Sequence, residues 1–240
     1  VQYVKLRSDE GASIYFDCET TGLDWHQDEL ICVSLSTQEG EAFVIPILHN
    51  IAQSKELNVN LAWFWAEAEL GLVITALRTI FGLPCPKTGH HLLFDMRFLE
   101  RGRDDSAYIQ AVTAFHIRVE GPLRDTELMH HMVAEALPHN ETAVCAIYTG
   151  VPYYEAEMNL ASMGKKRMDM VPDEIMWPYS AADADVLPRM ERALMPIVRE
   201  EGTDWVLENL TYPMIRFCRR LEARGVPIDL EYFDSLCVEY

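Results

Sequence analysis

The run Ile14-Tyr15-Phe16-Asp17-Cys18-Glu19 places two carboxylates in an otherwise apolar segment. Its aromatic and β-branched content predicts a buried strand that ends at the polar turn Thr20-Thr21-Gly22. Because residues i and i+2 of a strand project from the same face, we expect Asp17 and Glu19 to stand side by side, about 7 Å apart.

These two acids need compensation if they are buried, because an unpaired buried charge is costly. Protonation, a cationic partner or a metal ion can provide it. No Lys or Arg follows until much further along the chain, which favours a metal. The alternative is that one of the two acids faces solvent at a frayed strand end.

The composition is that of a globular protein. The 240 residues, 49% of them hydrophobic, suffice for one large α/β domain or for a domain with an appendage. No apolar run approaches the length of a membrane span, and no signal peptide is predicted. Val1 in place of an initiator Met suggests a fragment or a processed chain.

The cysteines and the net charge restrict compartment and partners. The six cysteines form no CxxC pair, so we expect buried, unpaired thiols and a cytoplasmic or other reducing compartment, not secretion. The net charge of −18 argues against a tight, independent duplex-binding module, because such modules neutralise phosphates with basic side chains. It does not exclude an enzyme that holds a few nucleotides through divalent cations.

Three further segments have strand-like patterns. Residues 30–35 and 42–47 are β-rich runs separated by a turn, so together with 14–19 they predict an antiparallel meander. Residues 1–10 are expected to form an edge strand.

Four segments have the apolar spacing of helices. These are 60–81, a segment from about 92 with Gly102 as its C-cap, 125–137 with Asp125 as its N-cap, and about 179–199, which Pro172 or Pro178 could open. Region 139–170 has no clear pattern. Its basic cluster at 165–167 is expected to be a solvated loop, and contact with a nucleic-acid strand is the alternative.

Two of these helices carry an acid on their apolar stripe. Asp95 joins Leu92, Phe98 and Leu99, and Asp183 lies one turn after Tyr179 on a stripe that continues to Ile197. Asp185 points about 160° away from Asp183 and is expected to be solvated.

Three separate elements therefore place acids where core residues belong. If Asp17, Glu19, Asp95 and Asp183 converge at the edge of one sheet, a divalent metal site explains them better than three unrelated polar residues, and carboxylate ligands suit Mg²⁺ or Mn²⁺. The histidine pairs at 90–91 and 130–131 are interpreted as ordinary polar or packing residues rather than transition-metal ligands.

Three stretches resemble a known set of motifs. Residues 16–24 (FDCETTGLD), 89–95 (GHHLLFD) and 179–185 (YSAADAD) are similar, in order and spacing, to the three exonuclease motifs of the DEDD superfamily. In detail they resemble the 3′-5′ proofreading domain of family A DNA polymerases, the bacterial DNA polymerase I type. The position of Tyr179 matches the tyrosine branch, since the histidine branch would have His where Pro178 stands.

This resemblance covers nearly the whole chain and implies a fold and an activity. The implied fold is α/β, a ribonuclease H-like mixed sheet flanked by helices, with the exonuclease domain in 1–208 and the helical start of a missing polymerase domain in 209–240. The implied reaction is hydrolysis of single-stranded or frayed DNA 3′ ends to 5′-mononucleotides. The implied partners are that DNA end and a polymerase domain in the same or a separate chain, with no membrane.

The resemblance also implies roles for the acids in two-metal hydrolysis. Asp17 would bridge two Mg²⁺ or Mn²⁺ ions, Glu19 and Asp183 would complete the first, and Asp95 would reach the second through water.

Four further residues would act on water and substrate. Tyr179 would orient the attacking water, since a phenol is a poor base at neutral pH. Thr20 would contact the terminal nucleotide and Leu23 would wedge against its base, although a turn threonine and a core leucine are the alternatives. His91 departs from the family, which usually has Asn there to help hold the substrate phosphate.

Two rival functions stay open. A ribonuclease D-like exoribonuclease would share the four acids and the tyrosine, although residues 221–229 resemble the junction into a polymerase domain and favour DNA. A catalytically silent scaffold that supports a polymerase is the other, and the intact set of acids argues against it.

Overall fold

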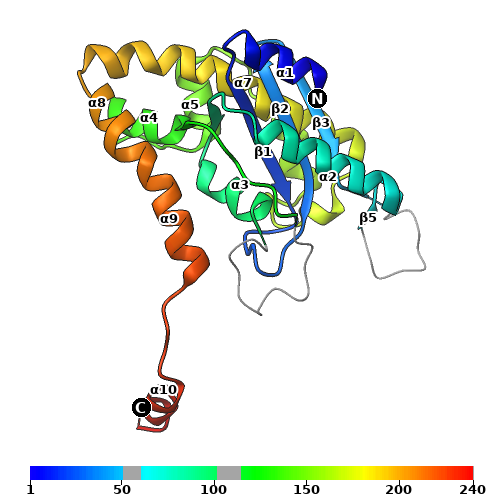
Figure 1. Ribbon diagram of the computed structural model, residues 1–240, viewed down its shortest axis with the longest axis vertical. Helices are drawn as coiled ribbons and strands as arrows, with labels where there is room; N and C mark the ends of the chain where they lie inside the picture. The colour runs from blue at the N-terminus through cyan, green and yellow to red at the C-terminus, as the bar shows by residue number, and fades with distance from the viewer. Residues whose placement is uncertain (51–60, 102–114, 240) are drawn as a thin grey trace.

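A mixed five-stranded sheet forms the centre of the computed structural model, which describes residues 1–50, 61–101 and 115–239 (Figure 1). The strand order is β3-β2-β1-β6-β7, in which β1 is antiparallel to β2 and parallel to β6. The strands are β1 Ile14–Thr20, β2 Leu30–Gln38, β3 Glu41–Pro46, β6 Lys87–Gly89 and β7 Leu123–Asp125, with a separate pair β4 Leu48–Asn50 and β5 Leu61–Trp63. The predicted α/β class and the antiparallel meander are confirmed.

Helices surround this sheet. They are α1 Gln2–Asp9, α2 Glu67–Phe81, α3 Leu92–Leu99, α4 Thr126–Val133, α5 Glu141–Tyr148, α6 Ala156–Ala161, α7 Asp173–Glu200, α8 Asp204–Val206, α9 Tyr212–Arg224 and α10 Leu230–Glu239, with short η1 Met168–Met170 and η2 Leu207–Thr211. Among the described residues, no helix is both long and apolar enough to cross a membrane.

The alternation of β1 decides which side chains meet which helix. α2 and α7 lie on opposite faces of the sheet (Figure 1). On one face the ring of Phe16 packs edge-on against Phe81 of α2, with centroids 4.8 Å apart. Because successive strand residues point to opposite faces, Asp17 and Glu19 face the other side, where α7 crosses β1, β2 and β3.

Asp125 connects α4 to α3. Its carboxylate caps α4 by accepting hydrogen bonds from the backbone N–H groups of Glu127 and Leu128, as the sequence predicts. It also accepts one from Leu92 N at 2.8 Å, at the first residue of α3. The same side chain therefore fixes the start of the helix that carries Asp95.

Two predicted elements at the N-terminal side differ from the structure. Residues 1–10 form helix α1 rather than an edge strand, because only Val4 of this segment enters the core and Gly11, at φ +88°, ends the helix. The predicted helix over 60–81 begins at Glu67, since residues 61–63 pair with β4 instead. Residue 60 and the predicted cap at Gly102 lie outside the described residues.

The long helix is opened by Pro172, one of the two prolines that could open it, and does not begin near Tyr179. α7 starts at Asp173, with Pro172 at the N-cap position, and runs through Pro178 rather than starting after it. Pro178 is exposed and lies in the second turn, and the backbone N–H of Asn50 donates to Asp173 Oδ1 at 3.0 Å, which holds the first turn in place.

The cysteines are free throughout the described chain. Four of them are buried, as expected, but Cys218 is partly exposed and Cys237 is exposed.

Candidate active site

The end of β1 supplies the first two carboxylates. Asp17 lies opposite Ser34 and Glu19 opposite Cys32 in the β1–β2 register, and the pairing shifts between Glu19 and Thr20. Glu19 is buried and Asp17 partly so. Neither stands at a frayed strand end, so the solvent-facing alternative does not describe this pair.

Helix α7 brings a third carboxylate to the same place. Asp183 is 4% exposed, and one oxygen from each of Asp17, Glu19 and Asp183 lies within 4.8 Å of the other two. No other trio of Asp, Glu, His or Cys side chains lies as close together in the described part of the chain. Residues separated by more than 160 positions therefore share one small volume.

Asp95 on α3 is a fourth buried acid near this trio. Its side chain is 2% exposed, and its Oδ2 has no hydrogen-bond partner among the described residues. Burial raises the pKa of Asp95 well above its usual value, and the charges of Asp17, Asp125 and Glu19 raise it further. Asp95 is thus electrostatically coupled to the β1 pair, although it is not part of the trio within 4.8 Å.

Burial perturbs all three carboxyls of the trio, and repulsion between the acids adds to its effect on Glu19 and Asp183. Burial raises the pKa of Asp17 to about 6, against the opposite effect of Lys165 and the Cys18 N–H. Burial and the charge of Asp17 raise the pKa of Asp183 to about 8. Burial and the charges of Asp17 and Asp183 raise the pKa of Glu19 well above its usual value. Full ionisation of the trio therefore requires added positive charge.

This arrangement fits a hard divalent cation. The donors are carboxylate oxygens, which Mg²⁺ and Mn²⁺ prefer. The trio is near enough to share an ion, and buried Asp95, which interacts with Asp17 and Glu19 by charge, has an oxygen with no hydrogen-bond partner in the described chain.

Comparison with known proteins agrees with this geometry. A family model described as a 3′-5′ exonuclease, of the DNA polymerase A type, matches residues 2–199. This chain belongs to that 3′-5′ exonuclease family. The resemblance stated from the three motifs is confirmed.

Two curated relatives of the exonuclease are whole polymerases. DNA polymerase I of Pseudomonas aeruginosa is 26% identical over 226 residues, which cover 92% of this chain and 22% of the relative. The DNA polymerase of Escherichia phage T5 is 27% identical over 230 residues, which cover 91% of this chain and 24% of the relative. The chain thus spans about a quarter of the length of these relatives.

Brucella melitensis NrnC has a similar fold. Its structure matches this exonuclease with a TM-score of 0.62 and 19% identity, covering 89% of this chain and 86% of NrnC. Another structure of NrnC contains bound Mg²⁺ and matches with a TM-score of 0.60.

Tyr179 stands one helical turn before Asp183 in the exonuclease. Its hydroxyl accepts a hydrogen bond of 2.6 Å from Lys165 Nζ. Burial and the charge of Asp183 raise the pKa of Tyr179 far above its usual value, so the phenol keeps its proton. Burial opposes the charge of Lys165, but Glu155, Asp183 and the neighbouring acids outweigh it and raise the pKa of the ammonium.

Sequence reasoning missed three residues beside the exonuclease site. Tyr154 donates a hydrogen bond of 2.7 Å to Asp183 Oδ1, and its hydroxyl lies 3.5 Å from Glu141 Oε1. Lys165, expected in a solvated loop, points to Tyr179 instead. Asn140 caps α5 by accepting from Ala143 N, a signal that predicts a helix after it, but no pattern indicates that Glu141 would face the acids.

The predicted substrate residues lie in different settings. Thr20 is buried, and its hydroxyl donates to the carbonyl of Gly22 at 2.7 Å. Leu23 is 83% exposed, which excludes its alternative as a core leucine. His91 adopts a left-handed backbone with φ 58°, and its Nδ1 lies 2.7 Å from Glu127 Oε2. That hydrogen bond raises the pKa of His91.

Proposed function

We propose that this chain is the proofreading exonuclease of a DNA polymerase. It removes nucleotides from single-stranded or frayed DNA 3′ ends and releases 5′-mononucleotides by metal-dependent hydrolysis. The observation that carries this proposal is the convergence of Asp17, Glu19 and Asp183, whose oxygens lie within 4.8 Å of one another, with buried Asp95 nearby.

These four carboxylates would hold two Mg²⁺ or Mn²⁺ ions, with Asp17 shared between them. When bound, such a pair lowers the pKa of the attacking water and offsets the charge that develops on the phosphate. Each carboxylate can contribute because the cations would stabilise its ionised form at neutral pH.

Tyr179 and Lys165 would act together on water and phosphate. A phenol oxygen that accepts from Lys165 still has its own O–H to donate. Because the phenol keeps its proton, Tyr179 orients the attacking water and does not act as its base. The Lys165 ammonium adds positive charge beside the acids, where it can pair with a substrate phosphate.

The residues around the site suit the binding of single-stranded DNA. Exposed Leu23 follows the β1 motif and is placed to wedge against a terminal base, while Thr20 would contact the terminal nucleotide. His91 would take the place of the family's phosphate-holding Asn. Its backbone N–H donates to Asp125 and its Nδ1 contacts Glu127, so its Nε2 is the ring nitrogen that could reach a phosphate. The net charge of −18 disfavours retention of matched duplex.

Incubation with matched oligonucleotides tests the substrate. With Mg²⁺ present, we expect stepwise shortening of a 5′-labelled single-stranded DNA and release of 5′-mononucleotides. We expect the rate on the RNA of the same sequence to be lower by at least about tenfold, because one hydrogen-bonded group gained or lost changes a rate by at least about that factor. Faster hydrolysis of the RNA would favour the ribonuclease D-like alternative. No hydrolysis of either, together with no Mn²⁺ binding in calorimetry, would favour the silent scaffold.

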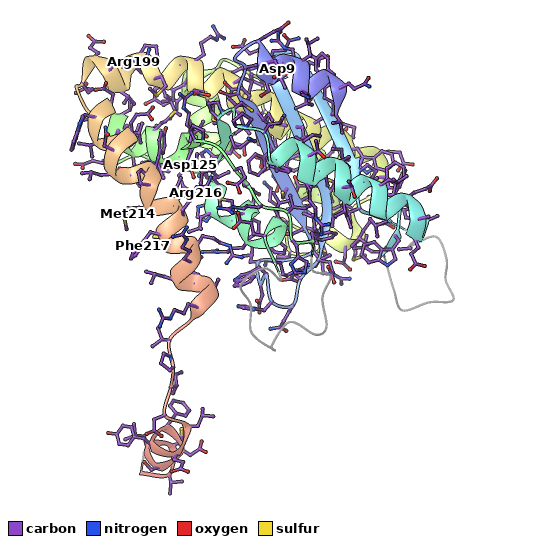
Figure 2. The ribbon with its side chains drawn as sticks, in the orientation of Figure 1. Asp9, Asp125, Arg199, Met214, Arg216 and Phe217 are labelled. Atoms are coloured by element: carbon purple, nitrogen blue, oxygen red, sulfur yellow. The ribbon has the colours of Figure 1, made fainter. Side chains whose placement is uncertain are left out.

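The C-terminal helices offer the contact surface for the polymerase domain. We place the exonuclease domain in 1–208 and the start of the polymerase domain in 209–240. The inner face of α9 packs against the segment that leads into β7, where Arg216 donates to the carbonyls of Val119 and Gly121 at 2.7 and 2.8 Å. Met214 and Phe217 point away from the sheet, opposite Arg216 (Figure 2).

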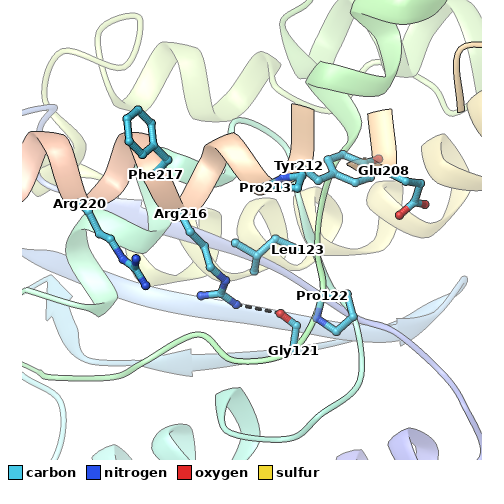
Figure 3. A pocket seen from close by; sticks show the side chains of 9 residues that line it. All are labelled: Gly121, Pro122, Leu123, Glu208, Tyr212, Pro213, Arg216, Phe217 and Arg220. Carbon is cyan, nitrogen blue, oxygen red and sulfur yellow. Dashed lines mark hydrogen bonds between the residues drawn. The ribbon is translucent and has the colours of Figure 1, made fainter. Parts of the chain in front are cut away.

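The outer face of α9 and of the preceding η2 is an exposed apolar stripe, defined by Leu210, Met214, Phe217 and Leu221. These residues have i, i+4, i+7, i+11 spacing and are each about half exposed. A cavity of about 440 Å³ opens beside the stripe, between α9 and the segment that enters β7, with Phe217 and Arg220 on its wall (Figure 3). The relatives extend to about four times the length of this chain, so their polymerase part is the occupant that we propose for this face.

Phe217→Asp tests this contact. In the chain alone we expect a loss of unfolding free energy below about 0.5 kcal/mol, because the side chain is half exposed. In a longer chain that includes the polymerase domain we expect a loss above about 2 kcal/mol, because an unpaired charge would be buried at the contact. Urea unfolding of both proteins measures the difference. Ile147→Asp, at an exposed position on α5, is the control, and an equal effect of Phe217→Asp in both chains would contradict the contact.

A further inference from the structure

Asp183 lies beside two tyrosines. Tyr179 precedes it on α7, and Tyr154 approaches from the segment between α5 and α6, with the two rings 6.1 Å apart. Both tyrosines interact with Asp183, since hydrogen bonds from Tyr154 and from Tyr179 oppose the rise in its pKa, but their hydroxyls differ in their other contacts. Tyr179 Oη is 2.6 Å from Lys165 Nζ, whereas Tyr154 Oη is 2.7 Å from Asp183 Oδ1.

Tyr154 has one proton to donate and two acceptors in reach. Asp183 Oδ1 is 2.7 Å away, whereas Glu141 Oε1 is 3.5 Å away, at the limit of a hydrogen bond. The proton therefore goes to Asp183, and the only hydrogen-bond contact of Glu141 with this group in the described chain is the long one to the Tyr154 hydroxyl.

The backbone next to Tyr154 is anchored on both sides. The neighbouring Glu155 is buried, and its carboxylate accepts a hydrogen bond from Thr142 of α5. The same carboxylate pairs with Lys165 Nζ at 3.5 Å and with Asn159 of α6 at 3.4 Å. These contacts hold the segment in place, so the hydroxyl of Tyr154 meets Asp183 at a fixed position.

We propose that Tyr154 is a positioning residue of Asp183 and that Glu141 contacts the Tyr154 hydroxyl and is not a fifth ligand of a cation. A hydrogen bond to Oδ1 fixes the plane of the Asp183 carboxylate and leaves Oδ2 for a cation, and groups that hold ligands in this way contribute strongly to metal affinity. The inference rests on the proposed metal-dependent function but concerns ligand orientation, so it is measured by metal binding itself.

Calorimetric titration with Mn²⁺ at neutral pH tests it. Tyr154→Phe removes one oxygen and keeps the ring. We expect Mn²⁺ affinity to fall about tenfold with the same number of ions bound. Tyr153→Phe is the matched control, because Tyr153 is 62% exposed and its hydroxyl bonds only Asn159 among the described residues. We expect its Mn²⁺ affinity to stay within about twofold of the original chain.

The rate of hydrolysis gives a second readout. For Tyr154→Phe, the Mg²⁺ concentration at half-maximal rate should rise about tenfold, while the rate at saturating Mg²⁺ stays within about threefold of the original. A purely structural role would lower the saturated rate and leave the half-maximal concentration unchanged, and that result would overturn the proposal.

Glu141→Gln tests the second half of the proposal. The amide still fits beside the Tyr154 hydroxyl, so we expect the same number of ions and an affinity within about threefold of the original. Loss of one bound ion would identify Glu141 as a ligand and overturn this half. An unchanged affinity in Tyr154→Phe would overturn the first.

The outcomes separate this proposal from the proposed function. If the original chain binds Mn²⁺ but hydrolyses neither DNA nor RNA, the nuclease function fails and the role of Tyr154 is still judged from the titration. If the original chain binds no Mn²⁺, both fail.

Discussion

Asp183→Asn is expected to lower the rate of Mg²⁺-dependent hydrolysis of single-stranded DNA by about a thousandfold. Asn preserves the shape of the side chain and can still accept the hydrogen bond from Tyr154, but it removes the negative charge. A lost metal ligand forfeits transition-state stabilisation of roughly 4 kcal/mol, which corresponds to this factor. Asp17→Asn should have at least as large an effect, because Asp17 is the acid that we propose both ions share. Release of 5′-mononucleotides at saturating Mg²⁺ measures both rates.

Asp185→Asn is the matched control on the same helix. Asp185 lies two residues beyond Asp183, but it pairs with Arg189 at 2.9 Å and accepts a hydrogen bond from the backbone N–H of Gly40. Its loss should change the rate by less than about twofold. Equal losses in Asp183→Asn and Asp185→Asn would show that damage to α7, not to a ligand, causes the effect. Undiminished hydrolysis by Asp183→Asn and Asp17→Asn would end the nuclease hypothesis.

The acids were predictable because local periodicity determines where they point. Asp17 and Glu19 alternate with core residues on β1, and Asp183 occupies an apolar stripe on α7, so their faces follow from two- and 3.6-residue repeats. That α3 would place Asp95 near them depends on the order of β1, β6 and β7 in the sheet. Sequence periodicity carries no information on that order, which came instead from the resemblance of the motifs.

The residues that sequence reasoning missed lie where periodicity is absent. Tyr154 belongs to an irregular segment that is held by Glu155, and Lys165 lies in a turn in which Met163, Gly164 and Lys165 all have positive φ values. Such positions are set by contacts between distant residues, such as Lys165 with Tyr179, rather than by local patterns. The helix at 2–9 was missed for a different reason, because short apolar runs fit a strand or a helix equally well.

Removal of divalent cations is expected to make the fold less stable at about pH 8.5 than at about pH 6.5. Asp183, with its pKa raised to about 8, still holds a proton at the lower pH in the folded chain, whereas an unfolded Asp is ionised at both. The folded state therefore binds more protons, and its stability falls as the pH rises through the raised pKa. One proton over this interval corresponds to a loss of about 2 kcal/mol. Urea unfolding in EDTA at the two pH values measures it.

Variants and added Mg²⁺ show which groups cause this loss of stability. Glu19 and Asp95, whose pKa values burial also raises, contribute in the same direction. Burial lowers the pKa of His90 to about 4, so that group stays neutral throughout the interval. Asp183→Asn should reduce the pH dependence, since it removes one of the titrating groups. Mg²⁺ at about a hundred times its dissociation constant should restore about 2.7 kcal/mol at the higher pH, because it binds the ionised carboxylates of the folded state. A stability that rises with pH in EDTA, or that Mg²⁺ leaves unchanged, would mean that the buried acids do not form a cation site.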